Sequence, residues 1–157
     1  MLKQMKERFL VNTRTAALQE KNPEYMELFI SEWKKFEEEN DENQDLLVNY
    51  QLEYLALSKD YSGYKKLAKH YLDSLVTAKT LNEIKASDKA VYDEYMKKNA
   101  DDYSISGRGT KQQLLQGKEA LEQVKKIGRV GGTYLSIPDN TNADYKQLLK
   151  WADYGIT

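Results

Sequence analysis

Few residues of this chain have the type and spacing that catalysis or metal binding requires. His70 is the only histidine, and Leu67 stands where a Glu-x-x-His metal motif has its glutamate. The chain has no cysteine, which excludes thiolate nucleophiles, disulfides and cysteine-ligated zinc. We therefore predict that the protein is not an enzyme, with no catalytic residue, no metal site and no cofactor. His70 is expected to be solvated or hydrogen-bonded.

Two other segments contain residues that could do chemistry, but neither has the required arrangement. Glu37, Glu38, Glu39, Asp41 and Glu42 form an acidic run, whereas a catalytic carboxylate pair needs two environments that separate its pKa values. A solvated acidic helix end is the expected structure. Residues 106–111 contain two glycines but lack the glycine, lysine, serine order of a phosphate-binding loop. We expect a flexible loop at this position.

Tyrosine is the residue type with the clearest potential for binding, because its ring is apolar and its hydroxyl is polar. Five tyrosines between residues 43 and 76 fall at helical spacing, so they could line a groove that holds a peptide or a partner helix. The alternative, which the sequence favours, is that these rings are core residues with hydroxyls at its rim. The candidate binding residues are Tyr50, Tyr54, Tyr61, Tyr64 and Tyr71.

Two helices joined by a short turn are expected to position these tyrosines, over residues 43–76. Apolar residues recur at steps of three and four in both halves, which is the period of an amphipathic helix. Ser58, Lys59 and Asp60 allow only a tight antiparallel turn, and Asp60 can accept from the N–H groups that open the second helix. The two apolar stripes are Leu47, Tyr50, Tyr54 and Leu57, followed by Tyr61, Tyr64, Ala68, Tyr71 and Leu75.

Capping residues and apolar periodicity predict the helices around this hairpin. Residues 2–20 have modest helical amphipathicity. The sequence Asn22-Pro23-Glu24 provides a cap, a proline at the first helical position and an acid at the positive end of the next helix. Thr80-Leu81-Asn82-Glu83 has the pattern of a capping box and begins a further helix. The apolar stripe predicted after Asn22 is Tyr25, Leu28, Phe29, Trp33 and Phe36.

The second half of the chain contains more glycine, and we predict two non-helical segments there. Residues 99–109 have the composition of a flexible loop. Thr110-Lys111-Gln112-Gln113 resembles a second capping box, whose helix is expected to end at Gly128. Residues 128–141 are then expected to form a connector, and Asn142 to cap the last helix. That helix carries Tyr145, Leu148, Leu149 and Ala152, with Trp151 beside them.

Length and charge narrow the class of protein further. A chain of 157 residues suits a single domain. With 24 basic and 25 acidic side chains it has no electrostatic footprint for nucleic acid. Its apolar runs are far shorter than the roughly 20 residues of a membrane span, so we predict no membrane insertion. The amino terminus lacks the apolar core and cleavage site of a secretion signal.

Two resemblances concern the helical region. The segment KDYSGYKKLAKHYL, residues 59–72, resembles the turn and second helix of a tetratricopeptide repeat. Residues 22–155, with NPEYM, Tyr71-Leu72 and DYKQLLKWADYG, resemble the helical region that follows the thioredoxin-like domain in secreted proteins of Bacteroides-type bacteria. The second resemblance implies a helical companion of a redox domain, acting by contact in the periplasm or outside the cell. Since Cys-x-x-Cys is absent, it supplies no redox residue.

The sequence therefore predicts an all-α fold of antiparallel helical hairpins, either tetratricopeptide-like or an irregular bundle, in one domain over residues 1–157. The expected function is that of a non-catalytic interaction module that binds a protein or peptide through its tyrosine-bearing surface. The alternative is a structural companion domain that packs against a separate thioredoxin-like redox domain. An enzyme would require a water-excluding pocket with a perturbed carboxylate or His70. The oligomeric state is left open.

Overall fold

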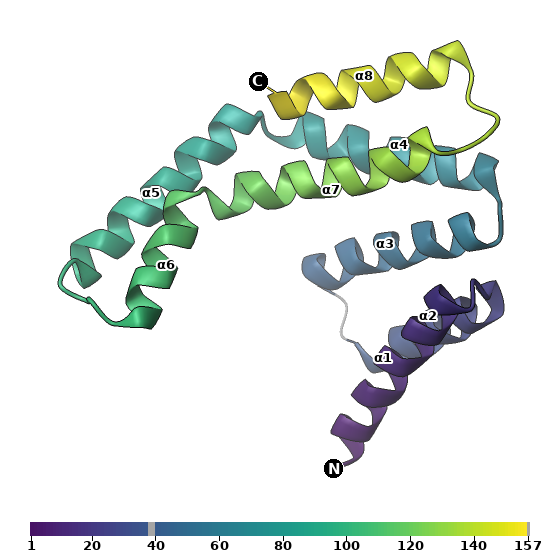
Figure 1. The fold of residues 1–157 in the computed structure, drawn as a ribbon, viewed down its shortest axis with the longest axis horizontal. Coiled ribbons are helices and arrows are strands. Elements are labelled where there is room, and N and C mark those ends of the chain that lie inside the picture. The colour runs from purple at the N-terminus through teal and green to yellow at the C-terminus, as the bar shows by residue number, and fades with distance from the viewer. Residues whose placement is uncertain (38–39, 157) are drawn as a thin grey trace. The chain divides into compact units, whose positions relative to one another are not determined.

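The computed structural model describes residues 1–37 and 40–156, and within them the chain forms eight helices and no strand (Figure 1). The all-α prediction is confirmed. Where the sequence predicted one domain, the chain has two compact units, Met1–Tyr71 and Leu72–Thr157, with their boundary inside the fourth helix. The helices are α1 (Leu2–Gln19), α2 (Pro23–Phe36), α3 (Asp41–Leu57), α4 (Tyr61–Ala78), α5 (Leu81–Asn99), α6 (Ile105–Leu115), α7 (Lys118–Leu135) and α8 (Asn142–Ile156).

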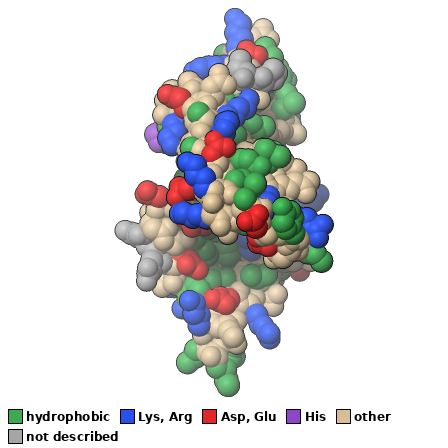
Figure 2. Space-filling model, turned by 90° about the vertical axis from the view of Figure 1, so that its left-hand side faces the viewer, with side chains coloured by type: hydrophobic (Ala, Val, Ile, Leu, Met, Phe, Trp, Pro, Cys, Tyr) green, Lys and Arg blue, Asp and Glu red, His purple; other side chains and the backbone are tan. Residues whose placement is uncertain are grey.

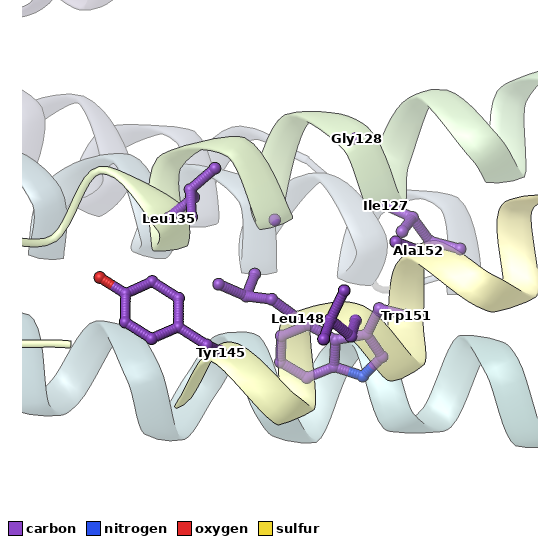
Figure 3. Close-up of a pocket in the computed structure, with 9 residues that line it drawn as sticks. Ile127, Gly128, Leu135, Tyr145, Leu148, Trp151 and Ala152 are labelled. Atoms are coloured by element: carbon purple, nitrogen blue, oxygen red, sulfur yellow. The ribbon is translucent and has the colours of Figure 1, made fainter. Parts of the chain in front are cut away.

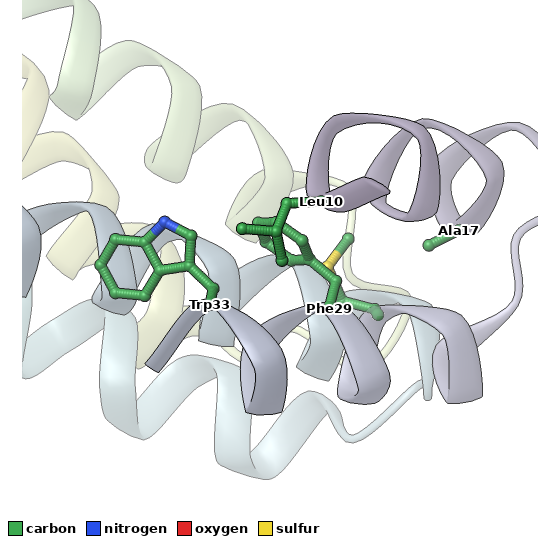
Figure 4. Close-up of a cluster of buried hydrophobic side chains, with 5 residues drawn as sticks. Leu10, Ala17, Phe29 and Trp33 are labelled. Carbon is green, nitrogen blue, oxygen red and sulfur yellow. The ribbon is translucent and has the colours of Figure 1, made fainter. Parts of the chain in front are cut away.

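The core of the first unit lies between α1, α2 and α3. Asn22 caps α2 as predicted, because its side-chain oxygen accepts a hydrogen bond of 2.9 Å from the Glu24 N–H. The predicted stripe of α2 is partly wrong, since Tyr25 and Leu28 are 40% and 46% exposed while Met26 is fully buried. The stripe that faces the core therefore starts at Met26 and continues at steps of three and four. The core residues are Leu10, Ala17, Met26, Phe29 and Trp33 (Figure 4).

The predicted hairpin is present as α3 and the first part of α4, which run antiparallel (Figure 1). Asp60 accepts a hydrogen bond of 2.9 Å from the Gly63 N–H and so caps α4, as expected. Across the hairpin, the Tyr71 hydroxyl donates to Asp45 at 2.7 Å. The two helices are thus fixed at the turn and again near the far end.

The start of α3 lies earlier than predicted and changes the interpretation of the acidic run. Asn40 caps the helix by accepting from the Asn43 N–H at 2.8 Å, so Asp41 and Glu42 lie in the first turn. Carboxylates at this position stabilise a helix through its dipole. Asp41 and Glu42 therefore lie at the start of α3 and not at the end of α2. Glu38 and Glu39 lie outside the described residues.

Two helix starts in the second unit depend on capping residues close to them in sequence. The capping box at Thr80 and Glu83 is confirmed, because each of these residues accepts from the backbone N–H of the other. The predicted loop over residues 99–109 is wrong for its second half, since Ser104 accepts from the Gly107 N–H at 3.0 Å and begins α6. Thr110 consequently lies inside α6 rather than at a helix start, and its hydroxyl donates to the Ser106 carbonyl.

The start of α7 depends on a residue that is remote in sequence. Gly117 adopts a left-handed conformation with φ of 75° and separates α6 from α7. The Asp88 carboxylate, which belongs to α5, then accepts from the N–H groups of Glu119 and Ala120 at 3.0 and 2.9 Å. A negative charge at a helix N-terminus interacts favourably with the dipole. Asp88 therefore caps a helix to which it does not belong.

The predicted connector over residues 128–141 is also mostly helix. From Lys118, α7 continues through three glycines to Leu135, so only residues 136–141 connect it to α8. Periodic apolar packing sustains the helix, because Ile127, Val130 and Tyr134 are buried at steps of three and four. The start of α8 is capped by Thr141 rather than Asn142, since the Thr141 hydroxyl accepts from the Asp144 N–H and the Asp144 carboxylate accepts from the Thr141 N–H.

We expect Asp88→Ala to lower the free energy of unfolding by about 2 kcal/mol, because a buried N–H group and a part-buried one lose their carboxylate acceptor. Urea unfolding followed by circular dichroism measures this change. The matched control is Asp93→Ala on the same helix, which removes an exposed ion pair with Lys89 and should change stability by less than about 0.5 kcal/mol. Equal effects of the two substitutions would contradict the capping role of Asp88.

Candidate functional site

The position of α8 in the second unit is fixed by Trp151, whose side chain is 1% exposed. Its indole N–H donates to Asp73 of α4 at 3.0 Å, and Gln147 donates to the same carboxylate oxygen at 3.2 Å. The indole meets the Tyr134 ring of α7 edge-on, with 5.6 Å between ring centroids. Trp151 therefore connects α8 to both α4 and α7.

A second contact fixes the far end of α8 against α7. The Tyr134 hydroxyl donates to Asp144 at 2.6 Å, and Asp144 also belongs to the capping box of α8. Burial raises the pKa of Tyr134, and the hydrogen bond to the carboxylate raises it further. A tyrosine with its ordinary pKa of about 10 is already protonated at neutral pH, and the raised pKa extends the range in which Tyr134 donates to more alkaline pH.

An apolar groove of about 440 Å³ lies between α7 and α8 (Figure 3). Its lining has no charged side chain, and the Tyr145 hydroxyl is its only side-chain polar group apart from the indole N–H of Trp151. Three lining residues remain open to solvent, with exposed fractions of 57% for Leu135, 63% for Leu149 and 44% for Tyr145. The lining residues are Ile127, Gly128, Gly131, Leu135, Tyr145, Leu148, Leu149, Trp151 and Ala152.

Gly128 and Gly131 lie on the α7 side of this groove with Ile127 and Leu135, and Gly132 follows directly after Gly131 in the helix. A Cβ added at Gly131 would make an ordinary contact of 3.8 Å with Leu148, and one added at Gly128 or Gly132 would meet no described side chain within 4 Å. Glycine inside a helix costs roughly 0.5–1 kcal/mol relative to alanine. The packing of the described residues therefore gives no steric reason for glycine at positions 128 and 132.

The five tyrosines selected from the sequence do not form one exposed surface. Tyr64 and Tyr71 are 3% and 6% exposed, so they are core residues, in agreement with the alternative that the sequence favoured. Tyr54 and Tyr61 are half-buried on α3 and α4. A partner could reach parts of these two rings, but not the rings of Tyr64 and Tyr71.

Tyr50 contacts two aromatic rings and one guanidinium. Its ring meets Phe29 and Trp33 edge-on, at centroid distances of 4.7 and 5.4 Å, and the Arg14 guanidinium lies 5.3 Å from its centroid. Arg14 also donates to both carboxylate oxygens of Glu53, and this bond raises the pKa of Arg14. Tyr50 lines a cavity of about 210 Å³, but it mainly connects α1, α2 and α3.

Several further observations concern the described residues outside the groove. Among residues 1–37 and 40–156, no three side chains of the metal-ligating types come together. Within the same ranges, no helix is both long and apolar enough to cross a bilayer. His70 lies exposed on α4. On the face drawn in Figure 2, basic and acidic side chains are interspersed.

Comparison with known proteins gives no match to a family model, to a curated protein or to a solved structure. The α7–α8 groove must therefore be interpreted from its own chemistry. Its lining contains no acid, base or nucleophile arranged for catalysis. It consists of apolar side chains beside the backbone of Gly128 and Gly131. Such a site can bind the apolar face of another molecule.

The sequence contains a pattern that predicts the α7 side of this groove, but the glycines at residues 128–132 made the segment look like a connector. Ile127, Val130 and Tyr134 continue the apolar period of α7 across residues 128–132, which indicates a helix rather than a connector. The exposure of Leu135 and Leu149 could not be predicted, because both occur in apolar stripes that resemble core stripes. Only the packing of Trp151 decides which side of α8 is buried.

We expect Tyr64→Ala to lower the free energy of unfolding by about 3 kcal/mol or more, because it leaves a cavity in a closed core. Equilibrium urea unfolding provides the measurement. Tyr103 is 71% exposed, so Tyr103→Ala is the control and should cost less than about 1 kcal/mol. A small effect at Tyr64 would return this ring to the set of candidate binding residues.

Proposed function

We propose that this protein is a non-catalytic interaction module whose α7–α8 groove binds an amphipathic helix of a partner protein. The observation that carries this proposal is an uncharged groove with three large apolar side chains exposed along its walls. Contiguous exposed apolar surface of this kind is unfavourable in water unless another molecule covers it.

The shape of the groove favours a helix as its ligand. Because α7 and α8 run antiparallel (Figure 1), the groove between them is lined by two helices, and a third helix can pack against both. Gly128 lines the groove and leaves room for the side chains or backbone of that helix, and Gly132, one turn further along α7, also has open space around its Cβ position. The glycines then have a function that compensates for their cost to α7.

The exposed area indicates a reversible complex rather than an obligate one. Full burial of a leucine contributes about 2 kcal/mol, so covering the exposed parts of Leu135 and Leu149 would contribute roughly 1 kcal/mol each. Tyr145 would contribute a similar amount. Together these gains are about 3 kcal/mol, whereas a micromolar complex needs a net binding free energy of roughly 8 kcal/mol after the entropic cost of association. The partner helix must therefore also contact the rest of the groove lining.

The same groove supports a second candidate function, in which the partner helix belongs to a neighbouring domain of the same polypeptide. This is the companion-domain interpretation that the resemblance to thioredoxin-associated helical regions implies. Intramolecular docking raises the effective concentration of the helix, so weak apolar contacts suffice. In that case the groove binds the neighbouring domain and captures no separate protein.

We expect Leu149→Glu to abolish partner binding without unfolding the protein, because the side chain is 63% exposed and the new charge would be desolvated in the complex. Affinity capture from native extract, with the wild-type chain and the variant compared by quantitative mass spectrometry, measures the effect. Leu28 of α2 is 46% exposed and far from the groove in sequence, so Leu28→Glu is the matched control. Equal capture by Leu149→Glu and the wild type would contradict the proposal.

We expect Gly128→Ala and Gly132→Ala to have opposite effects on stability and on binding. Each should raise the free energy of unfolding by about 0.5–1 kcal/mol, since alanine suits a helix and the new methyl group meets no described atom. Each should also weaken partner binding by filling space in or beside the groove. Gly109→Ala in α6 is the control, because it also has open space around its Cβ and should stabilise the chain with binding unchanged.

A further inference from the structure

The outer side of α7 has a pattern of large and small residues that is symmetric about Gly128. Leu121 lies seven residues before this glycine, and Leu135 lies seven residues after it. Because seven residues make nearly two helical turns, all three lie on one side of the helix. The leucines are 42% and 57% exposed, and no described atom lies within 4 Å of the Cβ position of Gly128. This side of α7 therefore has a leucine towards each end and a hollow between them.

A surface with this symmetry is complementary to itself. When two α7 helices pack antiparallel and meet at Gly128, Leu121 of each copy faces Leu135 of the other, and the two glycines allow the backbones to approach closely. A two-fold axis between the helices and perpendicular to both produces this pairing, and two-fold dimers are the commonest homo-oligomers. The antiparallel direction also places the positive end of each helix dipole beside the negative end of the other.

The exposed apolar residues of α8 join this surface across the groove. Tyr145, Leu149 and Ala152 recur at steps of four and three, line the groove with α7 and are exposed. The axis that pairs the two α7 helices lies across α8 as well, so it brings α8 of one copy against α8 of the other. The two grooves then face each other.

We propose that the α7–α8 groove is covered by the same groove of a second copy of this chain, in a two-fold dimer whose α7 helices run antiparallel and meet at Gly128. The inference rests on the proposed function, because it names the partner whose amphipathic helices cover the groove. The interface is a four-helix bundle made of the two α7 and the two α8 helices.

A second copy supplies the additional apolar contact that the groove requires from its partner. Each copy exposes four large apolar side chains on α7 and α8, and a two-fold interface covers all of them in both copies. The lining residues are uncharged, so the groove meets its own copy without bringing like charges together inside it. At the rim, Lys125 pairs with Glu122 at 3.2 Å. The four side chains are Leu121, Leu135, Tyr145 and Leu149.

Disulfide trapping tests the pairing directly, because the chain has no cysteine and an introduced one is the only thiol of each variant. We expect a mixture of Leu121→Cys and Leu135→Cys to form a disulfide between the two variants under diamide. Neither variant alone should link to itself, since the two copies of either position lie about 20 Å apart along antiparallel helices and a disulfide needs Cα atoms within about 7 Å. Leu28→Cys mixed with Leu115→Cys is the control pair, exposed on α2 and α6, and should not link in any combination.

Sedimentation of the full-length protein at about 1 to 100 µM measures the dimer without a cross-link. We expect the wild type to change from monomer to dimer within this range. Leu121→Glu and Leu149→Glu should each weaken the dimer at least about tenfold, because the new carboxylate would be desolvated in the interface. Leu115→Glu adds the same charge on α6 and should leave the dimer unchanged, and circular dichroism verifies that all three variants fold.

The outcomes separate failure of this inference from failure of the proposed function. A wild type that stays monomeric overturns the inference, and so does self-linking of Leu121→Cys, which indicates parallel helices. If the wild type is monomeric but Leu149→Glu still abolishes capture of a partner from extract, the proposed function stands and only the inference is wrong. If the wild type is monomeric and capture is the same with and without Leu149→Glu, both proposals fail.

Discussion

The second unit depends on the burial of one side chain, Trp151. Its indole hydrogen bond to Asp73 and its edge-on contact with Tyr134 fix α8 against two other helices. Once Trp151 is buried, the period of the helix turns Leu149 toward solvent and leaves Tyr145 only partly covered. The same constraint that stabilises the unit therefore creates its exposed apolar groove.

Glycine has two different roles in this unit. At position 117 the backbone requires it, since φ is 75° and α7 begins at the next residue under the cap that Asp88 provides. At positions 128 and 132 the backbone is helical and a methyl group would meet no described atom. Glycine at these two positions destabilises the helix, and no contact among the described residues explains why glycine occurs there. The close approach of the partner helix that we propose would explain it.

Much of the fold could be predicted from the sequence, because several helices are capped by residues near the N–H groups that they satisfy. Asn22, Asp60 and Thr80 identified three helix starts correctly. Prediction failed at α7, since its cap is Asp88, which lies 31 and 32 positions away from the residues that it caps. It also failed at residues 128–135, where glycine composition concealed an apolar period that tertiary packing supports.

The candidate site was less predictable than the fold, because periodicity identifies an apolar stripe without showing what covers it. Tyr64 and Leu149 both occupy such stripes, yet Tyr64 is 3% exposed and Leu149 is 63% exposed. Chemical-shift mapping by NMR, with the isotope-labelled protein titrated with a synthetic amphipathic helical peptide, tests the central claim most directly. The account predicts shift changes concentrated at residues 127–135 and 145–152, with residues 2–60 unaffected. Changes centred on residues 2–60, or no changes at saturating peptide, would contradict it.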